Sequence, residues 1–382
     1  HFWYKGLDWL VTRKTIVIES MYLLNYYQPE KGISIGGSQR YSLDLGRLFY
    51  NNGYNVVFIT KACESMELDH EGWARVVALD VPYGSRGWIQ FSKRVYGLCE
   101  QIQPDLVCYS DLQIAWPFCY GNSFALQHGI AWDGPSKHIV NKVENYFRKQ
   151  AIKKVTKIIC VDTNFINWCR ATDSEFESYR DKLVYIPNYA DTDIFEYNYR
   201  EHKEGDLLKL FFPRRLVRHR GFSVFMDMCS ILLKKGYGIR PVLAIEDFRR
   251  EEFYNLYPQY SNMGFEVVHP GFEEIARHYS DSFLTFVPSL WSEGTSLSAI
   301  ESVCSGCPVI ASDVGGLGNV IIPHFNGLLL TPNVEVFVEA TESLINNMDK
   351  RNEMARNCQY VREYFAKCRW EKDVMQALST LL

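Results

Sequence analysis

The sequence predicts an α/β protein made of two consecutive doubly wound domains. Short apolar runs alternate with amphipathic segments along most of the chain, and a glycine-rich turn follows the first of these runs. A chain of 382 residues is also longer than one ordinary hydrophobic core supports. A polar, charged stretch over 187–206 interrupts the alternation, which then starts again.

The first half is predicted to begin with a βαβ unit. The apolar run at 15–20 indicates a buried strand, and Gly36 and Gly37 lie in the turn that follows it. Residues 40–60 are predicted to form a helix and then a second strand. Further strands are expected at 106–109, 123–127 and 157–161, with a helix over 137–154. This alternation predicts a parallel sheet that helices cover on both faces.

The second half repeats the pattern after a linker. We place the first domain at 1–195, the linker at 196–206 and the second domain at 207–365, and we expect the last helix, 366–382, to pack back on the first domain. The periodicity predicts that this final amphipathic helix starts near residue 350 and runs to 382. Strands of the second domain are expected at 208–212, 240–245, 265–268, 283–287, 309–311 and 327–330, with a helix over 221–235.

Composition argues against several classes of protein. The net charge of −4 gives no sign of a nucleic-acid partner, and no apolar run approaches the 18 residues of a membrane-spanning helix. Eleven scattered cysteines favour reduced thiols in a cytoplasmic protein. Cys304 and Cys307 form a CxxC pair that lacks a second ligand pair, so we expect a structural role. The first residues lack Met and the layout of a signal peptide, so the natural chain is expected to be longer.

The stretch SEGTSLSAIE, residues 292–301, lies where a predicted strand is followed by a helix. Ligands of open α/β sheets bind at such carboxyl ends. Thr295 or Ser296 is expected to cap the helix, whose first amides suit a phosphate, and Glu293 and Glu301 can bind hydroxyl groups on either side. A nucleotide-sugar has this layout of sugar, diphosphate and ribose. The alternative is an ordinary capped helix with two solvated acids.

A second candidate site follows the first strand of the second domain. The segment FFPRRLVRHRG, residues 211–221, gathers Arg214, Arg215, Arg218 and Arg220 in one loop. Guanidinium groups bind phosphate oxygens in pairs, so the loop is a candidate phosphate site. A solvated basic loop is the alternative.

Together these segments resemble the retaining glycosyltransferases of the GT-B fold, especially family 4, described as glycosyl transferases group 1. The matching motifs are EGTSLSAIESVCSGCPVIASDVGGLGNVI, NGLLL at 326–330, IPNYADTDIF, RRLVRHRG, the Gly36–Gly37 pair and GYNVV. They occur in the family's order over about residues 15–335. The resemblance implies two doubly wound, Rossmann-like domains that face each other across a cleft.

The resemblance also implies a role for each matching residue. Four residues are implied in catalysis: Glu293 at the sugar hydroxyls, His128 beside the reacting carbon, and Arg215 and Arg220 on the diphosphate. The implied donor-binding set is Gly36, Gly37, Arg214, Arg215, Arg220, Phe272, Gly294, Thr295, Ser296 and Glu301. Within this set Glu301 holds the ribose and Phe272 lies against the base. On residue type alone, His128 is an ordinary core or loop histidine.

Three positions depart from the family's pattern. Arg214 stands where the family usually has Gly, Arg220 where it has Lys, and Ser296 where it has a second Gly. Arginine keeps the positive charge of lysine but changes the contact geometry, and serine keeps its amide. Arg214 is expected either to add a phosphate contact or to point outward.

The resulting expectation is a retaining glycosyltransferase that moves a hexose-type sugar from a nucleoside-diphosphate sugar to a glycan or lipid-linked acceptor in polysaccharide biosynthesis. No metal or other cofactor is expected, because Asp191 and Asp193 lack further candidate ligands. The alternatives are an epimerase or hydrolase of the same fold and a non-catalytic sugar-nucleotide-binding domain. The family analogy adds a place in a larger multi-domain enzyme.

The acceptor side is less clearly marked. Aromatic residues make up 15% of the chain, and several, including Tyr22, Tyr26 and Tyr27, fall in first-domain loops where a glycan can stack. A basic helix is a candidate for contact with anionic lipid at the inner face of a membrane, although a solvated face is the simpler interpretation. Its basic residues are Lys142, Arg148, Lys149, Lys153 and Lys154.

Overall fold

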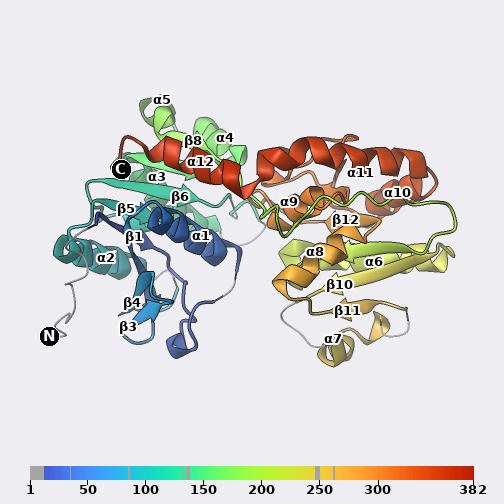
Figure 1. The fold of residues 1–382 in the computed structure, drawn as a ribbon, viewed down its shortest axis with the longest axis horizontal. Coiled ribbons are helices and arrows are strands. Elements are labelled where there is room, and N and C mark those ends of the chain that lie inside the picture. The colour runs from blue at the N-terminus through green and yellow to red at the C-terminus, as the bar shows by residue number, and fades with distance from the viewer. Residues whose placement is uncertain are drawn as a thin grey trace.

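The computed structural model describes residues 13–34, 36–84, 87–130, 132–134, 138–245, 250–260 and 263–382. It contains two α/β domains that lie side by side, each built around one sheet (Figure 1). The predicted architecture of two consecutive doubly wound α/β domains is confirmed. Among the described helices, none combines the length and the apolar character that crossing a bilayer requires.

The sheet of the first domain has eight strands in the order β3-β4-β2-β1-β5-β6-β7-β8. Their bounds are β1 Thr15–Glu19, β2 Asn55–Ala62, β3 Met66–His70, β4 Ala74–Asp80, β5 Leu106–Tyr109, β6 Ser123–Gln127, β7 Lys157–Cys160 and β8 Leu183–Tyr185. All neighbours are parallel except β3 and β4. Helices α1 (Gly37–Asn51), α2 (Trp88–Ile102), α3 (His138–Lys154), α4 (Thr163–Thr172) and α5 (Phe176–Tyr179) complete the domain.

Strands β3, β4 and β8 were not predicted. β3 is a polar edge strand that alternates between half-buried and exposed residues, so it carries no continuous apolar run. β8 is apolar, but it has only three residues, all half-buried. β4 contains the apolar run Val76–Leu79 and was missed despite it.

The second sheet is parallel throughout, in the order β11-β10-β9-β12-β13-β14. Its strands are β9 Leu208–Phe212, β10 Ile239–Ala244, β11 Glu266–Val268, β12 Leu284–Val287, β13 Val309–Ser312 and β14 Gly327–Leu330. Its helices are α6 Phe222–Lys234, α7 Arg250–Leu256, α8 Phe272–Ser280, α9 Leu297–Cys304, α10 Val334–Ile345 and α11 Met348–Arg362.

Each sheet separates two hydrophobic cores, because successive side chains of a strand point to opposite faces. In β1, Ile16 and Ile18 belong to one core and Val17 to the other. In the second domain, Phe212 belongs to one core and its neighbour Phe211 to the other. Burial on both faces explains why these strands are continuous apolar runs.

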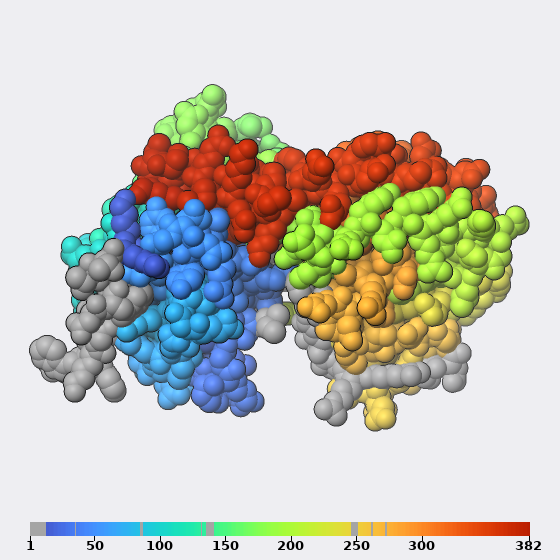
Figure 2. All heavy atoms as spheres, viewed as in Figure 1, coloured from blue at the N-terminus to red at the C-terminus, as the bar shows by residue number. Residues whose placement is uncertain are grey.

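The chain crosses between the domains twice. The first crossing follows β8, and the second leads from α11 into α12 (Lys367–Leu378). The two crossings lie against each other, because Ala190 N donates to Phe365 O at 2.9 Å and Lys367 N donates to Ala190 O at 3.0 Å. In Figure 2 the last residues form one red band over both domains. The stretch expected to be one helix from about residue 350 is therefore two helices, separated by a short turn at Glu363–Phe365.

Helix α12 packs into the core of the first domain. Trp370, Val374 and Leu378 are fully buried there. The Trp370 indole donates to the Tyr41 hydroxyl of α1 at 3.0 Å and stacks on Tyr189, with 4.1 Å between ring centroids. The end of the chain is thus a structural part of the first domain.

Candidate functional site

The segment Glu293–Ser296 lies between β12 and α9 and packs directly against the first domain. A Cβ added to Gly294 would lie 2.7 Å from the carbonyl oxygen of His128, and one added to Gly129 would lie 2.6 Å from the Gly294 backbone. Gly316 of the second domain also approaches the first domain, since its added Cβ would lie 2.8 Å from the Cβ of Asp162. These glycines let the two domains approach each other closely.

Thr295 ties the same segment to the first domain through its side chain. Its hydroxyl donates to Val161 O at 3.0 Å and accepts from Asn188 N at 3.1 Å. The side-chain amide of Asn188 donates from Nδ2 to Thr295 O at 2.6 Å. Ser296 occupies the N-cap position of α9, but within the described atoms its side chain makes no capping hydrogen bond. The prediction that one of these hydroxyls caps the helix is therefore wrong, because Thr295 is used between the domains.

Glu293 is held by two arginines. Arg214 donates to both carboxylate oxygens, at 2.9 and 2.5 Å, and Arg220 pairs with Oε2 as well. The Ser289 hydroxyl donates to Oε1. Burial raises the pKa of the Glu293 carboxyl, but the opposite pull of Arg214 and Arg220 is larger and lowers the pKa to about 2. Glu293 is consequently ionised over the whole physiological range.

Arg214 adopts an orientation that differs from both expectations, because its guanidinium lies on Glu293. Its side chain is 4% exposed and donates to Ser289 Oγ at 2.7 Å as well as to Glu293. The outward orientation is therefore wrong. Both terminal nitrogens contact protein oxygens, and the side chain fixes Glu293 from the position where the family usually has glycine.

Arg215 faces the glycine turn of the first domain. Its side chain is exposed, and its Nη2 lies 3.5 Å from the position that a Cβ on Gly36 would take. Gly36 is the N-cap of α1, and a Cβ on Gly37 would lie 3.3 Å from Leu297, the first residue of α9. The amino-terminal ends of two helices and one arginine therefore meet between the domains. Each helix end carries partial positive charge, so this place suits an anion.

Glu301 is engaged on both oxygens. Arg40 of α1 donates from Nη2 to Oε1 at 2.6 Å, and the buried Tyr279 hydroxyl donates to Oε2 at 2.9 Å. The Glu301 side chain is 8% exposed and that of Arg40 is 29% exposed. A ribose that binds Glu301 must compete with Arg40. Sequence reasoning missed Arg40, although a basic residue in the first turn after Gly36–Gly37 was a usable signal.

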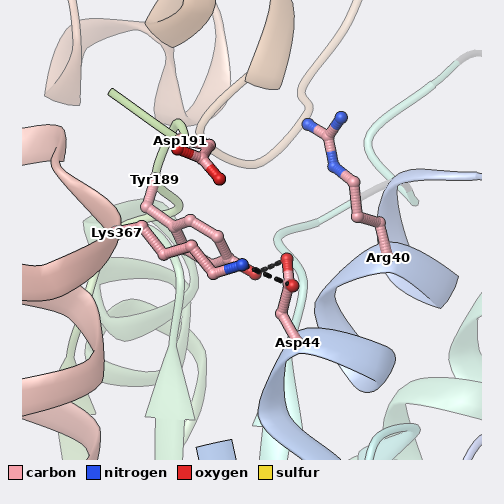
Figure 3. Close-up of a pocket in the computed structure, with 5 residues that line it drawn as sticks. All are labelled: Arg40, Asp44, Tyr189, Asp191 and Lys367. Atoms are coloured by element: carbon pink, nitrogen blue, oxygen red, sulfur yellow. Dashed lines mark hydrogen bonds and ion pairs between the residues drawn. The ribbon is translucent and has the colours of Figure 1, made fainter. Parts of the chain in front are cut away.

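Arg40 also lines a cavity of about 90 Å³ between α1 and the two crossing segments (Figure 3). In this cavity Asp44 accepts from Lys367 at 2.7 Å and from the Tyr189 hydroxyl at 2.6 Å. Asp191 lies on its wall and also accepts from Asp193 N in a tight turn. In the described part of the chain, no three His, Cys, Asp or Glu side chains gather as metal ligands.

His128 lies at the domain contact with its imidazole turned toward α1. The ring packs edge-on against Tyr41, with 5.2 Å between centroids. Among the described atoms its Nε2 is buried without a hydrogen-bond partner, and burial lowers the pKa of the imidazole to about 4. The ring is neutral near pH 7. Its role beside the reacting carbon stays a prediction.

Two other predicted contacts have different outcomes. Phe272 begins α8, but its side chain lies outside the described residues. On the basic helix α3, Arg148 packs 4.2 Å from the Trp132 ring centroid, Lys149 donates to Thr172 O at 2.5 Å, and Lys153 pairs with Glu175 at 2.7 Å. Much of that basic face is therefore engaged within the chain.

Two α/β domains, each built on a largely parallel sheet and joined by close contacts at glycines, have the architecture of the GT-B fold. Solved structures agree on the fold. Sucrose-phosphate synthase from Thermosynechococcus elongatus superposes with a TM-score of 0.78 at 17% identity, over 97% of this chain and 99% of that one. Anabaena HepE in complex with UDP-glucose superposes at 0.69 and 14%, over 96% and 100%.

Sequence comparison points to the same class of protein. Residues 194–360 match the family described as Glycosyl transferases group 1. An uncharacterized glycosyltransferase of Methanocaldococcus jannaschii is 26% identical over 257 residues, which cover 66% of this chain and 68% of the relative. A D-inositol 3-phosphate glycosyltransferase of Paenarthrobacter aurescens is 25% identical over 193 residues, 46% of either chain. The match thus spans about half the length of the second relative.

Proposed function

We propose that the protein is a retaining glycosyltransferase that moves a hexose-type sugar from a nucleoside-diphosphate sugar to a hydroxyl of a glycan or lipid-linked acceptor. One observation carries the donor assignment. Arg215 and the amino-terminal ends of α1 and α9 converge between the domains, at Gly36, Gly37 and Leu297. Oriented amides and a guanidinium together suit a diphosphate. The HepE structures contain UDP and UDP-glucose, which makes UDP the first nucleotide to test.

The charge state of Glu293 supports retention without a covalent glycosyl-enzyme. A carboxylate held by two arginines, with a pKa of about 2, is a poor nucleophile and a poor proton acceptor. Glu293 is suited instead to orient sugar hydroxyls. We infer that the leaving phosphate accepts the proton of the acceptor hydroxyl on the face where the new bond forms.

The departing diphosphate requires positive charge nearby. Arg215 and the two helix ends supply it, and Arg220 stands beside them with its charge shared with Glu293. We therefore propose a reaction that needs no metal or other cofactor. The contact between the domains would exclude water and limit hydrolysis of the donor.

The wider role remains part of the proposal. The match of residues 194–360 to the group 1 family supports synthesis of a polysaccharide or a lipid-linked glycan at the cytoplasmic face of a membrane. It also supports a place within a longer, multi-domain enzyme. The basic face of α3 contributes little to a membrane contact, because Arg148, Lys149 and Lys153 already have partners in the chain.

Thermal shift with UDP, GDP, dTDP, ADP and CMP tests the donor site directly. One diphosphate should raise the melting temperature of the wild type, and Arg215→Ala should lose that shift. Arg218→Ala is the matched control, because Arg218 is exposed in the same loop. A shift that Arg215→Ala retains would reject this phosphate site. With the donor sugar, product analysis without acceptor would reveal an epimerase or hydrolase.

A further inference from the structure

Four tyrosine rings gather on the first domain. Tyr22, Tyr26 and Tyr27 follow β1, and Tyr83 follows β4. The ring centroid of Tyr83 lies 5.6 Å from that of Tyr22, 5.0 Å from that of Tyr26 and 5.7 Å from that of Tyr27. We refer to these four residues as the tyrosine cluster.

The outer members of the tyrosine cluster are open to solvent. Tyr27 is 69% exposed and Tyr83 is 56% exposed, and their rings stack on each other. Neighbouring exposed aromatic side chains on a folded protein commonly mark a binding surface. Both exposed members are tyrosines, so the surface offers aromatic faces and phenol hydroxyls together.

The cluster is held in place from beneath. Lys61 of β2 is fully buried, and its Nζ lies 4.5 Å from the Tyr22 ring centroid and 5.9 Å from that of Tyr83. The same ammonium donates to Gly84 O at 3.3 Å, and the Tyr26 hydroxyl donates to Val81 O at 3.0 Å. A cation beneath the rings fixes their positions before any ligand arrives.

The tyrosine cluster is joined to the proposed phosphate site through one residue. Gln39, in the first turn of α1, donates from Nε2 to Tyr22 O at 3.0 Å. Its other amide atom, Oε1, lies beside Gly36, the glycine that Arg215 faces. One side chain therefore connects the backbone of the tyrosine cluster with the glycine turn at the proposed phosphate site.

We propose, resting on the proposed function, that the tyrosine cluster is an acceptor subsite that binds a pyranose ring of a glycan. A pyranose presents a face of C–H groups and a rim of hydroxyls, which match the aromatic faces and the phenol groups of Tyr27 and Tyr83. The acceptor that this surface selects is a carbohydrate, recognised by stacking on the exposed rings.

Saturation-transfer NMR tests the subsite. The probes are methyl glycosides of glucose, galactose and mannose, together with maltotriose and cellotriose. The wild type should transfer saturation to ring C–H protons, and titration of the best probe gives Kd. The double variant Tyr27→Ala/Tyr83→Ala should raise Kd by about tenfold. The double variant with Phe at both positions should stay within about threefold, because it keeps the aromatic faces.

Tyr360→Ala is the matched control, because Tyr360 is 70% exposed on α11 of the other domain. It should leave Kd unchanged. The thermal shift with UDP, measured on every variant, separates this proposal from the donor assignment. Glycan binding without any nucleotide shift would support the subsite and reject the donor site.

Three results would overturn the proposal. The first is an unchanged Kd in the Tyr27→Ala/Tyr83→Ala variant. The second is a wild type that responds to UDP and binds no glycan of the panel. The third is binding of anionic phospholipid vesicles that depends on the two exposed tyrosines and is not displaced by the glycans, which would assign the surface to a membrane.

Discussion

Arg40 on α1 donates a hydrogen bond of 2.6 Å to Oε1 of Glu301 on α9, and this ion pair joins the two domains. The resemblance to the family assigns Glu301 to ribose hydroxyls. In this structure the arginine of the facing domain occupies that carboxylate. A ribose that binds Glu301 must therefore share this carboxylate with Arg40.

Removing Arg40 should strengthen nucleotide binding. A partly exposed ion pair contributes about 0.2–1 kcal/mol, so Arg40→Ala should lower the Kd for the nucleotide by up to about fivefold. Isothermal titration with the nucleotide that stabilises the wild type measures this change. Arg47→Ala is the control, since Arg47 is on the same helix and pairs with the exposed Glu71. Weaker binding by Arg40→Ala would mean that Arg40 contacts the ligand itself.

Glu293→Gln should destabilise the second domain. The change leaves Arg214 and Arg220 without a buried counter-charge. Removing one partner of a buried ion pair lowers the free energy of unfolding by about 3 kcal/mol. Urea unfolding of both proteins at pH 7 measures this difference. A difference below about 1 kcal/mol would contradict the buried, doubly paired state of Glu293.

The cost of Glu293→Gln should also depend on pH. The folded-state pKa of Glu293, about 2, lies below the ordinary value of 4.5, so ionisation of this carboxyl stabilises the fold. That contribution is complete above pH 4.5 and is lost as the pH falls toward 2. The gap between wild type and variant should therefore be widest near neutral pH and narrow in acid. A difference in unfolding free energy between wild type and variant that widens in acid would contradict this prediction.

Gly294→Ala should separate the domains. The new methyl carbon would lie 2.7 Å from the carbonyl oxygen of His128, and a backbone group cannot move aside as a side-chain end can. We expect a fall in melting temperature of several degrees and a loss of transfer activity. Gly97→Ala is the control, because a Cβ there meets nothing within 4 Å and alanine favours a helix by about 0.5–1 kcal/mol. A melting temperature of Gly294→Ala equal to that of the wild type would show that the domains do not meet there.

Trp370→Ala should unfold the contact between α12 and the first domain. The indole is fully buried between Tyr41 and Tyr189, and removing such a side chain costs about 3–5 kcal/mol. In Trp370→Ala, amide hydrogen exchange should become faster than in the wild type, and the increase should be larger in α1 and α12 than in the second sheet. Trp370→Phe should cost less, because it keeps most of the packing and loses the hydrogen bond to Tyr41. Equal exchange in wild type and Trp370→Ala would contradict this role of α12.

The sequence by itself determined the two-domain α/β order and most strands. Buried parallel strands are continuous apolar runs, and that signal is local. The segment 292–301 and the arginine loop at 211–221 were also identified from local patterns, and the structure places both at the carboxyl ends of strands. Polar edge strand β3 and short β8 carried too weak a pattern to be recognised, and the apolar strand β4 was missed as well.

Only the tertiary structure decided which of these residues meet. Arg214 and Glu293 are 79 positions apart, Arg40 and Glu301 are 261 apart, and Trp370 and Tyr41 are 329 apart. Local periodicity reports whether a side chain faces a core or solvent, and it carries no distance to a partner elsewhere in the chain. Arg214 could thus be interpreted as a phosphate ligand until its guanidinium was found on Glu293. Contacts between domains depend on how two independently formed sheets dock, and close packing at glycines such as Gly129 and Gly294 sets that arrangement.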